Sequence, residues 1–145
     1  MTIAAVVNPA LGTTFLHGVV STYTAIAQVT SIDGPESEMG TRETTHLGST
    51  SKTYAKTLFD GGEPSLEIEF DPKSDSHAGL ITLFYGKTQA VDGELWKITF
   101  ADATNGPSNA AFKAIITNMG PSKIEPENNL MASIKLKISG DVTWT

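Results

Sequence analysis

The chain has no cysteine, and this absence excludes several kinds of chemistry at once. Without a thiol there is no disulfide scaffold, no thiolate nucleophile and no cysteine-ligated metal site. The 145 residues also hold no apolar run that approaches the roughly 20 residues of a membrane-spanning helix. Because no basic region precedes the apolar residues at the N-terminus, we expect neither a signal peptide nor a membrane anchor.

Basic residues are scarce, with 10 Lys and Arg against 16 Asp and Glu, which gives a net charge of -6. Proteins hold duplex DNA largely through Lys and Arg on the phosphates. The composition therefore argues against a protein that reads or grips DNA. It leaves room for a protein that DNA moves past without being held.

Recognisable catalytic patterns are also missing. There is no GxSxG sequence and no phosphate-binding glycine-rich loop. His17, His46 and His77 lie far apart and fit no metal-ligand spacing. Asp71 and Asp75 flank the start of a predicted helix, where acidic side chains ordinarily complement the helix dipole. We therefore expect no enzymatic activity, no cofactor and no bound metal.

The sequence does contain many short segments that alternate between apolar and polar residues, the pattern of half-buried strands. The 13 glycines and 7 prolines supply turns between them. One amphipathic helix is predicted from His77 to Tyr85, capped by Ser74 or Asp75 and ended by Gly86. We expect a mainly β fold, a β-sandwich or barrel-like domain with one flanking α-helix. The predicted strands are residues 13–20, 23–32, 53–59, 65–70, 94–101, 110–119 and 130–139.

The central predicted strand, residues 65–70, places Leu66, Ile68 and Phe70 on one face and Glu67 and Glu69 on the other. The later strands contribute further core residues by the same alternation. In the last strand Lys135 and Lys137 point outward, so they are candidates to complement the two glutamates across neighbouring strands or across a subunit interface. The core residues expected from the later strands are Trp96, Ile98, Phe100, Phe112, Ala114, Ile116, Leu130, Ala132, Ile134, Leu136 and Ile138.

Four local expectations concern connections and boundaries. Residues 1–20 are interpreted as an N-terminal arm and residues 21–145 as a single β-rich domain. Residues 36–52 are polar and lack a period, so they are expected to be a mobile loop or a segment ordered by a partner. The turn Asp60-Gly61-Gly62 is expected to join residues 53–59 and 65–70 into a hairpin. Residues 120–129 are expected to form a loop.

Several stretches resemble the tail tube (major tail) proteins of long-tailed bacteriophages. Residues 26–35 resemble an early strand of the form I-x-x-V-x-S-I-x-G-P, and residues 41–46 resemble the segment that follows it. Residues 60–72 are similar to a core of the form DGG-x-x-S-x-x-x-x-x-DP that precedes a helix. The end of the chain, residues 130–144, is similar to the closing strand. The resemblance runs from about Tyr23 to the C-terminus.

The resemblance implies packed β-sheets with one helix, and hexameric rings that stack into a hollow tube around a tape-measure protein. It implies a tail component of the virion, assembled in the host cytoplasm, that meets tail-tip and terminator proteins and lets DNA pass without specific binding. Two alternatives remain open: the tube subunit of a contractile or secretion machine, and a small β-sandwich binding or adhesin module.

Two groups of residues are the candidate sites under this interpretation. Glu67 and Glu69 are proposed to face the lumen, where negative charge repels DNA. The loop at residues 36–52 is proposed to contact the next ring. Its candidate contact residues are Glu36, Arg42, Glu43, His46 and Lys52.

Overall fold

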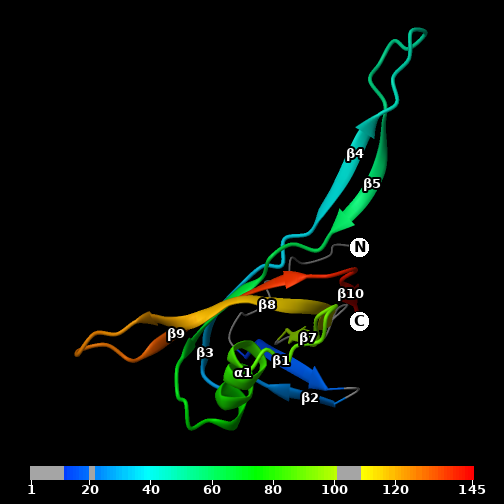
Figure 1. The fold of residues 1–145 in the computed structure, drawn as a ribbon. Helices are drawn as coiled ribbons and strands as arrows, with labels where there is room; N and C mark the ends of the chain where they lie inside the picture. The colour runs from blue at the N-terminus through cyan, green and yellow to red at the C-terminus, as the bar shows by residue number, and fades with distance from the viewer. Residues whose placement is uncertain (1–11, 20–21, 101–108) are drawn as a thin grey trace, which may run out of the picture.

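We describe the protein from a computed structural model, which defines residues 12–19, 22–100 and 109–145 (Figure 1). These residues form strands that curve around one core, with a helix against the core and a long hairpin that projects from it. The elements are β1 Thr14–Val19, β2 Thr22–Ala25, β3 Val29–Asp33, β4 Glu38–Glu43, β5 Tyr54–Asp60, β6 Ser65–Glu69, α1 Asp75–Tyr85, β7 Glu94–Thr99, β8 Asn109–Lys123, β9 Met131–Ile138 and β10 Thr143–Trp144.

The main sheet is antiparallel, with the strand order β2-β1-β7-β8-β9-β6-β3. The long strand β8 pairs with β7 and β10 near its start and with β9 along the rest of its length. The two ends of this order lie near each other, because residues 26–28 alone separate β2 from β3 along the chain, and β3 also contacts β1. The prediction of a mainly β, barrel-like domain with one flanking helix is confirmed.

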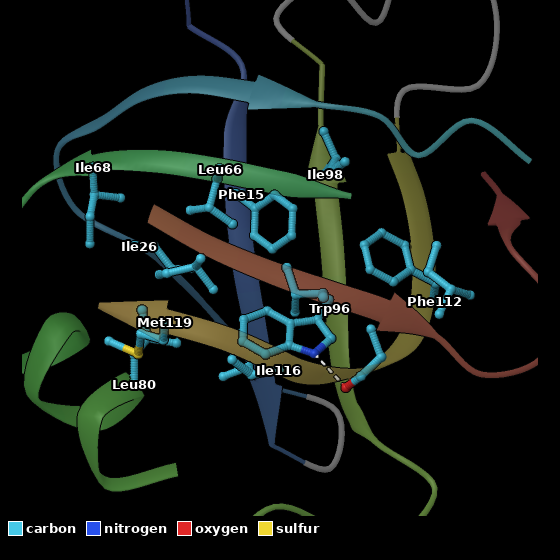
Figure 2. Close-up of a cluster of buried hydrophobic side chains, with 14 of the residues drawn as sticks. Phe15, Ile26, Leu66, Ile68, Leu80, Trp96, Ile98, Phe112, Ile116 and Met119 are labelled. Carbon is cyan, nitrogen blue, oxygen red and sulfur yellow. Dashed lines mark hydrogen bonds between the residues drawn. The ribbon is translucent and has the colours of Figure 1, made fainter. Parts of the chain in front are cut away.

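The core lies inside this curved sheet (Figure 2). Trp96 is fully buried, and its indole N–H donates a 3.0 Å hydrogen bond to the carbonyl of Ala114, so its polar atom is satisfied within the core. Phe15 packs between Trp96 and Phe112, at ring separations of 5.7 and 6.1 Å. The alternating positions predicted in the last four long strands are buried as expected, apart from Phe70, Phe100 and Leu130. Phe70 and Phe100 are half-buried against the core, and Leu130 is exposed.

The helix forms where the sequence predicts it. Ser74 is the residue before its first turn and Gly86 ends it. Leu80 is buried, while Ile81 and Phe84 pack partly against the core, so one face of α1 closes the sheet. Within the described residues no helix is long and apolar enough to cross a membrane.

His77, in the first turn of α1, is fully buried and joins three segments. Its Nδ1 accepts a hydrogen bond from the Asp71 backbone N–H (3.0 Å). Nδ1 is therefore unprotonated, so Nε2 carries the proton and donates to the carbonyl of Ala27 over 2.7 Å. The ring also stacks on Phe70, with its centroid 6.0 Å away. His77 thus holds the turn between β2 and β3 against the start of the helix.

The strand predicted over residues 23–32 is wrong as a single element. It is divided into β2 and β3 by a turn in which Gln28 has a φ of 59°. The turn brings Ile26 into the core, although simple alternation places it opposite Tyr23 and Val29. Alternation cannot reveal a reversal inside a continuous apolar pattern, since both halves keep the period of a strand.

The predicted hairpin of residues 53–59 with 65–70 is also wrong. β5 pairs with β4, while β6 pairs with β3 and β9. The polar segment at residues 36–52 therefore contains a strand, although its composition predicted a loop. β8 likewise continues to Lys123, into the segment expected to be a loop.

Part of the segment interpreted as an N-terminal arm is within the domain. Thr14–Val19 forms β1, which pairs with β2 on one edge and β7 on the other. Residues 1–11 lie outside the described residues.

Replacing His77 by Phe is expected to destabilise the protein by about 2 kcal/mol. The ring stacking is retained, but the Ala27 carbonyl and the Asp71 N–H lose their partners in a largely buried place. Denaturant unfolding measures the difference. Val91→Phe, at a position that is 98% exposed, is the control and should change the free energy of unfolding by less than about 0.5 kcal/mol. Equal stability of the two variants would contradict the structural role of His77.

Candidate functional site

The most prominent surface feature is the hairpin of β4 and β5, which projects away from the body of the domain (Figure 1). It forms a separate two-stranded sheet with no second layer within the described residues. An isolated two-stranded hairpin is at best marginally stable in water. The hairpin is therefore a surface that gains stability when a partner covers it.

Exposed apolar side chains are concentrated on this hairpin. Leu58 is 86% exposed, because neither β5 nor β4 covers its side chain. Apolar groups of this size gathered on one projecting element indicate a contact surface. The set comprises Met39, Leu47, Tyr54, Leu58 and Phe59.

The tip of the hairpin is ordered by its own hydrogen bonds. The Thr44 N–H donates to the carbonyl of Thr53 over 2.8 Å, and the hydroxyls of these two threonines lie 2.8 Å apart. The Nδ1 of His46 accepts a 3.2 Å hydrogen bond from the Gly48 N–H. These contacts give the tip a defined shape before any partner binds.

The base of the hairpin is fixed by Asp60, Gly61 and Gly62. A Cβ atom on Gly61 would meet the Ile138 side chain at 2.3 Å, and one on Gly62 would meet the Glu36 carbonyl oxygen at 2.4 Å. Gly62 also has a φ of 91°, which side-chain-bearing residues rarely adopt. The Asp60 carboxylate accepts the Gly62 N–H over 2.9 Å. The Asp-Gly-Gly sequence therefore lets the base of the hairpin pack closely against the body of the domain. The prediction that this sequence forms a hairpin turn into β6 is wrong.

All five residues predicted for an inter-ring contact are exposed on this arm or at its base. Glu36 lies at the base, Arg42 and Glu43 belong to β4, and His46 and Lys52 belong to the tip region. Arg42 and Glu43 are consecutive residues of a strand, so they point to opposite faces. The structure thus places the five on one element without gathering them into one site.

Sequence reasoning missed the apolar members of the hairpin. The sequence pattern places Leu58 and Phe59 in a strand that pairs with residues 65–70 in the main sheet, where one face of the strand would lie on the core. The sequence does indicate a contact surface here, because Leu58 and Phe59 are consecutive, and two consecutive large apolar residues give a strand two apolar faces. Such a strand is stable when other residues bury both of its faces, whereas β4 pairs with its edge and leaves both faces exposed.

The second candidate surface is the outer face of β6. Glu67 is exposed and Glu69 is half-buried, and Glu69 accepts a 3.1 Å hydrogen bond from the amide of Asn129. Their side chains share one face, as predicted, because they are two apart in a strand. In the paired strand β9, Glu67 lies opposite Ser133 and Glu69 opposite Met131.

The lysines of β9 meet different partners from those expected. Lys135 lies opposite Ser65, and Lys137 forms an ion pair with Glu63 at 3.4 Å. Both partners of that pair are largely exposed, so it contributes little to stability. The lysines therefore neutralise part of this face, while Glu67 and Glu69 form no ion pair among the described residues.

The histidines supply no catalytic or metal centre. Both ring nitrogens of His77 are used in backbone hydrogen bonds, so the cluster with Asp71 and Asp75 does not offer an imidazole ligand. Among the described residues no group of acidic and histidine side chains has the arrangement that a metal ion requires.

His17 is the other half-buried histidine, packed on Trp96 with ring centroids 4.8 Å apart. Its Nε2 is buried, has no hydrogen-bond partner within the described residues, and lies 3.8 Å from a carboxylate oxygen of Glu94. Burial lowers the pKa of His17 below its ordinary value of 6.5, although the Glu94 carboxylate partly offsets this effect.

Comparison of the sequence with models of known protein families identifies the family of this chain. The family model described as phage tail tube, TTP, lambda-like matches residues 12–145. The chain belongs to this family. It is a tail tube subunit, a structural component of a phage tail, and a non-enzymatic role follows from that membership.

Solved structures share the fold of this tail tube protein. A chain from the virion of a native gene transfer agent particle matches with a TM-score of 0.73 and 11% identity, covering 96% of this chain and 99% of that one. The SPP1 tail tube matches with a TM-score of 0.65 and 11% identity, covering 94% and 79%. A chain of the sheath–tube complex of the contractile injection system PVC matches with 0.65 and 13%, covering 94% and 91%. No protein with a curated description matches the chain.

The lowered pKa of His17 predicts a pH effect on the stability of this tail tube protein. As pH falls below about 6.5, the unfolded chain takes up a proton at His17 before the folded chain does, so folding stability decreases. Above that pH the stability contribution is fully present. We expect denaturant midpoints between pH 7 and 5 to fall less in His17→Gln than in the unaltered protein. Identical slopes in the two proteins would exclude this histidine as the cause.

Proposed function

We propose that six copies of this tail tube protein form a ring, and that the rings stack into a tube around a channel through which DNA passes. A tape-measure protein occupies the channel during assembly, and terminator and tail-tip proteins close the ends. Assembly takes place in the host cytoplasm. The projecting hairpin of β4 and β5, with its uncovered apolar side chains, is the observation that carries this proposal.

The hairpin supports stacking because it extends beyond the body of its own subunit (Figure 1). In this proposal it lies against the adjacent ring, where Leu58 and the other apolar side chains become buried. The exposed residues Glu36, Arg42, Glu43, His46 and Lys52 form the polar rim of that contact. A head-to-tail contact of this kind repeats along an axis without limit, as a tube requires.

Six-fold symmetry is supported by the fold of related tubes. The tail of an empty gene transfer agent particle, solved with C6 symmetry, matches this chain with a TM-score of 0.70, 11% identity and coverage of 91% of this chain and 94% of that one. Tubes of contractile injection systems share the fold as well, so fold alone does not separate the two kinds of machine. The family match favours the phage tail.

The outer face of β6 is proposed to line the channel. It carries Glu67 and Glu69, which repel the phosphates of a passing duplex. Lys135 and Lys137 on the neighbouring strand limit the net negative charge of this face. The balance suits a wall that DNA moves along without being trapped.

A monomeric binding module is less well supported. Ligand-binding modules of this kind present aromatic side chains on their surface, and Tyr54, Tyr85 and Trp144 are exposed here. The family match, rather than the surface, argues against such a module. Negative-stain electron microscopy over a range of concentrations tests the proposal directly. Rings or hollow tubes of uniform width are expected. A chain that stays monomeric, both alone and in the presence of its tail-tip proteins, would contradict it.

Replacing Leu58 by Ser is expected to reduce tube yield severely without unfolding the monomer. The substitution removes apolar surface from the proposed contact, while an exposed change costs less than about 0.5 kcal/mol of folding stability. Pelleting by ultracentrifugation measures tube yield, and thermal unfolding measures stability. Val91→Ser, at a position that is 98% exposed and outside the hairpin, should leave both unchanged. Normal tubes from the Leu58 variant would exclude its burial between rings.

The lumen assignment of Glu67 is tested by thiol labelling, which the absence of native cysteine makes specific. Glu67→Cys should react with a bulky polyethylene glycol maleimide much more slowly in tubes than in free subunits, because the reagent enters the channel poorly. A small maleimide should react at similar rates in both. Val91→Cys serves as the reference position. Unchanged labelling of Glu67→Cys by the bulky reagent would place this residue on the outer wall.

A further inference from the structure

A groove lies between α1 and the β1–β2 hairpin, apart from the two surfaces described above. Its volume is about 320 Å³, at the small end of the range for binding pockets, so it suits one or two side chains better than a whole helix. The lining is mostly apolar and includes Val19 and Leu83, together with Ile26 and Leu80 of the core (Figure 2). Gly79 leaves open space on the helix side, because a Cβ atom there would meet nothing within 4 Å.

The groove also carries one acidic group. Asp75 lines it from the first turn of α1, and its side chain is exposed. Within the described part of the chain this carboxylate forms no ion pair, and no Lys or Arg lines the groove. A partner that brings an apolar side chain with a positive charge beside it is therefore complementary to the groove.

The tip of the β4–β5 hairpin offers such an apolar side chain. Leu47 is fully exposed at the end of a tight turn. In this turn the Ser49 N–H donates to the His46 carbonyl over 2.9 Å, and the Ser49 hydroxyl accepts the His46 N–H over 3.1 Å. Because the turn is already ordered, burying Leu47 against a partner costs little additional conformational entropy.

The tip is also basic, on a chain whose net charge is -6. Residues 42–56 contain three of the ten Lys and Arg residues but one of the sixteen Asp and Glu residues. The three basic residues form no ion pair with any described residue, and they are Arg42, Lys52 and Lys56. Lys52 lies between the turn and β5, in the same loop as Leu47. The tip thus combines the two properties that complement the groove.

The groove and the hairpin tip lie on opposite sides of the molecule (Figure 1). The elements that form the groove, α1, β1 and β2, are on the side of the body away from the tip, so the tip does not reach the groove of its own chain. A second copy placed beyond the tip in the same orientation presents its groove toward the tip. This is the head-to-tail relation that stacked rings require.

We propose that the tip of the β4–β5 hairpin docks in the groove between α1 and the β1–β2 hairpin of a second copy in the adjacent ring. Leu47 enters the groove, and Lys52 faces Asp75. The inference rests on the proposed stacking of rings, and it identifies the surface that receives the hairpin.

The test uses engineered disulfides in the otherwise cysteine-free chain. Gly48→Cys keeps Leu47 in place and is combined in turn with Gly79→Cys on α1 and with Thr24→Cys on β2, which both line the groove. A disulfide needs Cα atoms within about 7 Å, so at least one pair should convert oxidised tubes into a ladder of cross-linked chains on non-reducing electrophoresis. Gly48→Cys with Ile124→Cys, at an exposed position just after β8, is the control and should cross-link at least about tenfold less efficiently.

The outcomes separate this proposal from the proposed function. Normal tubes that give no selective ladder with either groove pair would overturn docking in the groove and leave ring stacking intact. A stronger ladder through Ile124→Cys would place the tip at the end of the β8–β9 hairpin and would overturn the proposal as well. Failure of the unaltered protein to form tubes, alone or with its tail-tip proteins, would contradict the proposed function itself.

Charge reversal gives a second measurement, without cysteines. Lys52→Glu is expected to raise the subunit concentration needed for tube formation at least about fivefold, because two carboxylates then face each other. Adding Asp75→Lys should return that concentration to within about twofold of the original, since opposite charges meet again. Pelleting of tubes measures both effects.

Asp141→Lys is the matched control for the second substitution, because it makes the same change of net charge at an exposed residue that does not line the groove. Combined with Lys52→Glu, it should leave the assembly defect in place. Equal recovery with Asp75→Lys and with Asp141→Lys would show that net charge alone governs assembly. That result, or normal assembly of Lys52→Glu by itself, would contradict the pairing of Lys52 with Asp75.

Discussion

The constraint on which the structure depends is that one curved sheet has to enclose one core without a second sheet to cover it. β8 meets this constraint by changing neighbours along its length, with β7 and β10 near its start and β9 farther on. The pairing of β8 with β9 contains two register shifts, which bend a sheet and increase its twist. Trp96, anchored to the carbonyl of Ala114, fills the space that this curvature encloses. The helix then closes the remaining side.

This arrangement separates folding from assembly. The body has a core of fully buried side chains, among them Trp96, Phe15 and Ile134, which stabilises it without a neighbouring subunit. The hairpin has the opposite character, because within the described part of the chain its strands pair only with each other and leave apolar side chains in water. A subunit built in this way can fold as a monomer and still gain free energy on joining others.

The sequence predicted the elements well where one physical signal acted alone. The alternation around Leu66 and Ile134 identified core faces, and Ser74 and Gly86 bounded the helix, because period and capping are local properties. It failed where pairing between distant segments decided the outcome. The turn at Gln28 interrupts a pattern that remains strand-like on both sides, and β4 is polar because both its faces are exposed before assembly. Strand partners are set by the global topology, which local alternation does not encode.

The close packing of the hairpin base at Gly61 and Gly62 has a mechanical consequence. β5 has seven residues and is about 23 Å long, so a tilt of about five degrees at its base displaces the far end by about 2 Å. The position of the far end of the hairpin therefore depends on how rigidly the base is held. Because glycine has no side chain, the backbone packs directly against Ile138 and the Glu36 carbonyl. This close packing restricts tilting of the hairpin at its base. In the proposed stacking, Gly61 and Gly62 would thus limit errors of pitch along the tube, although they lie far from the contact between rings.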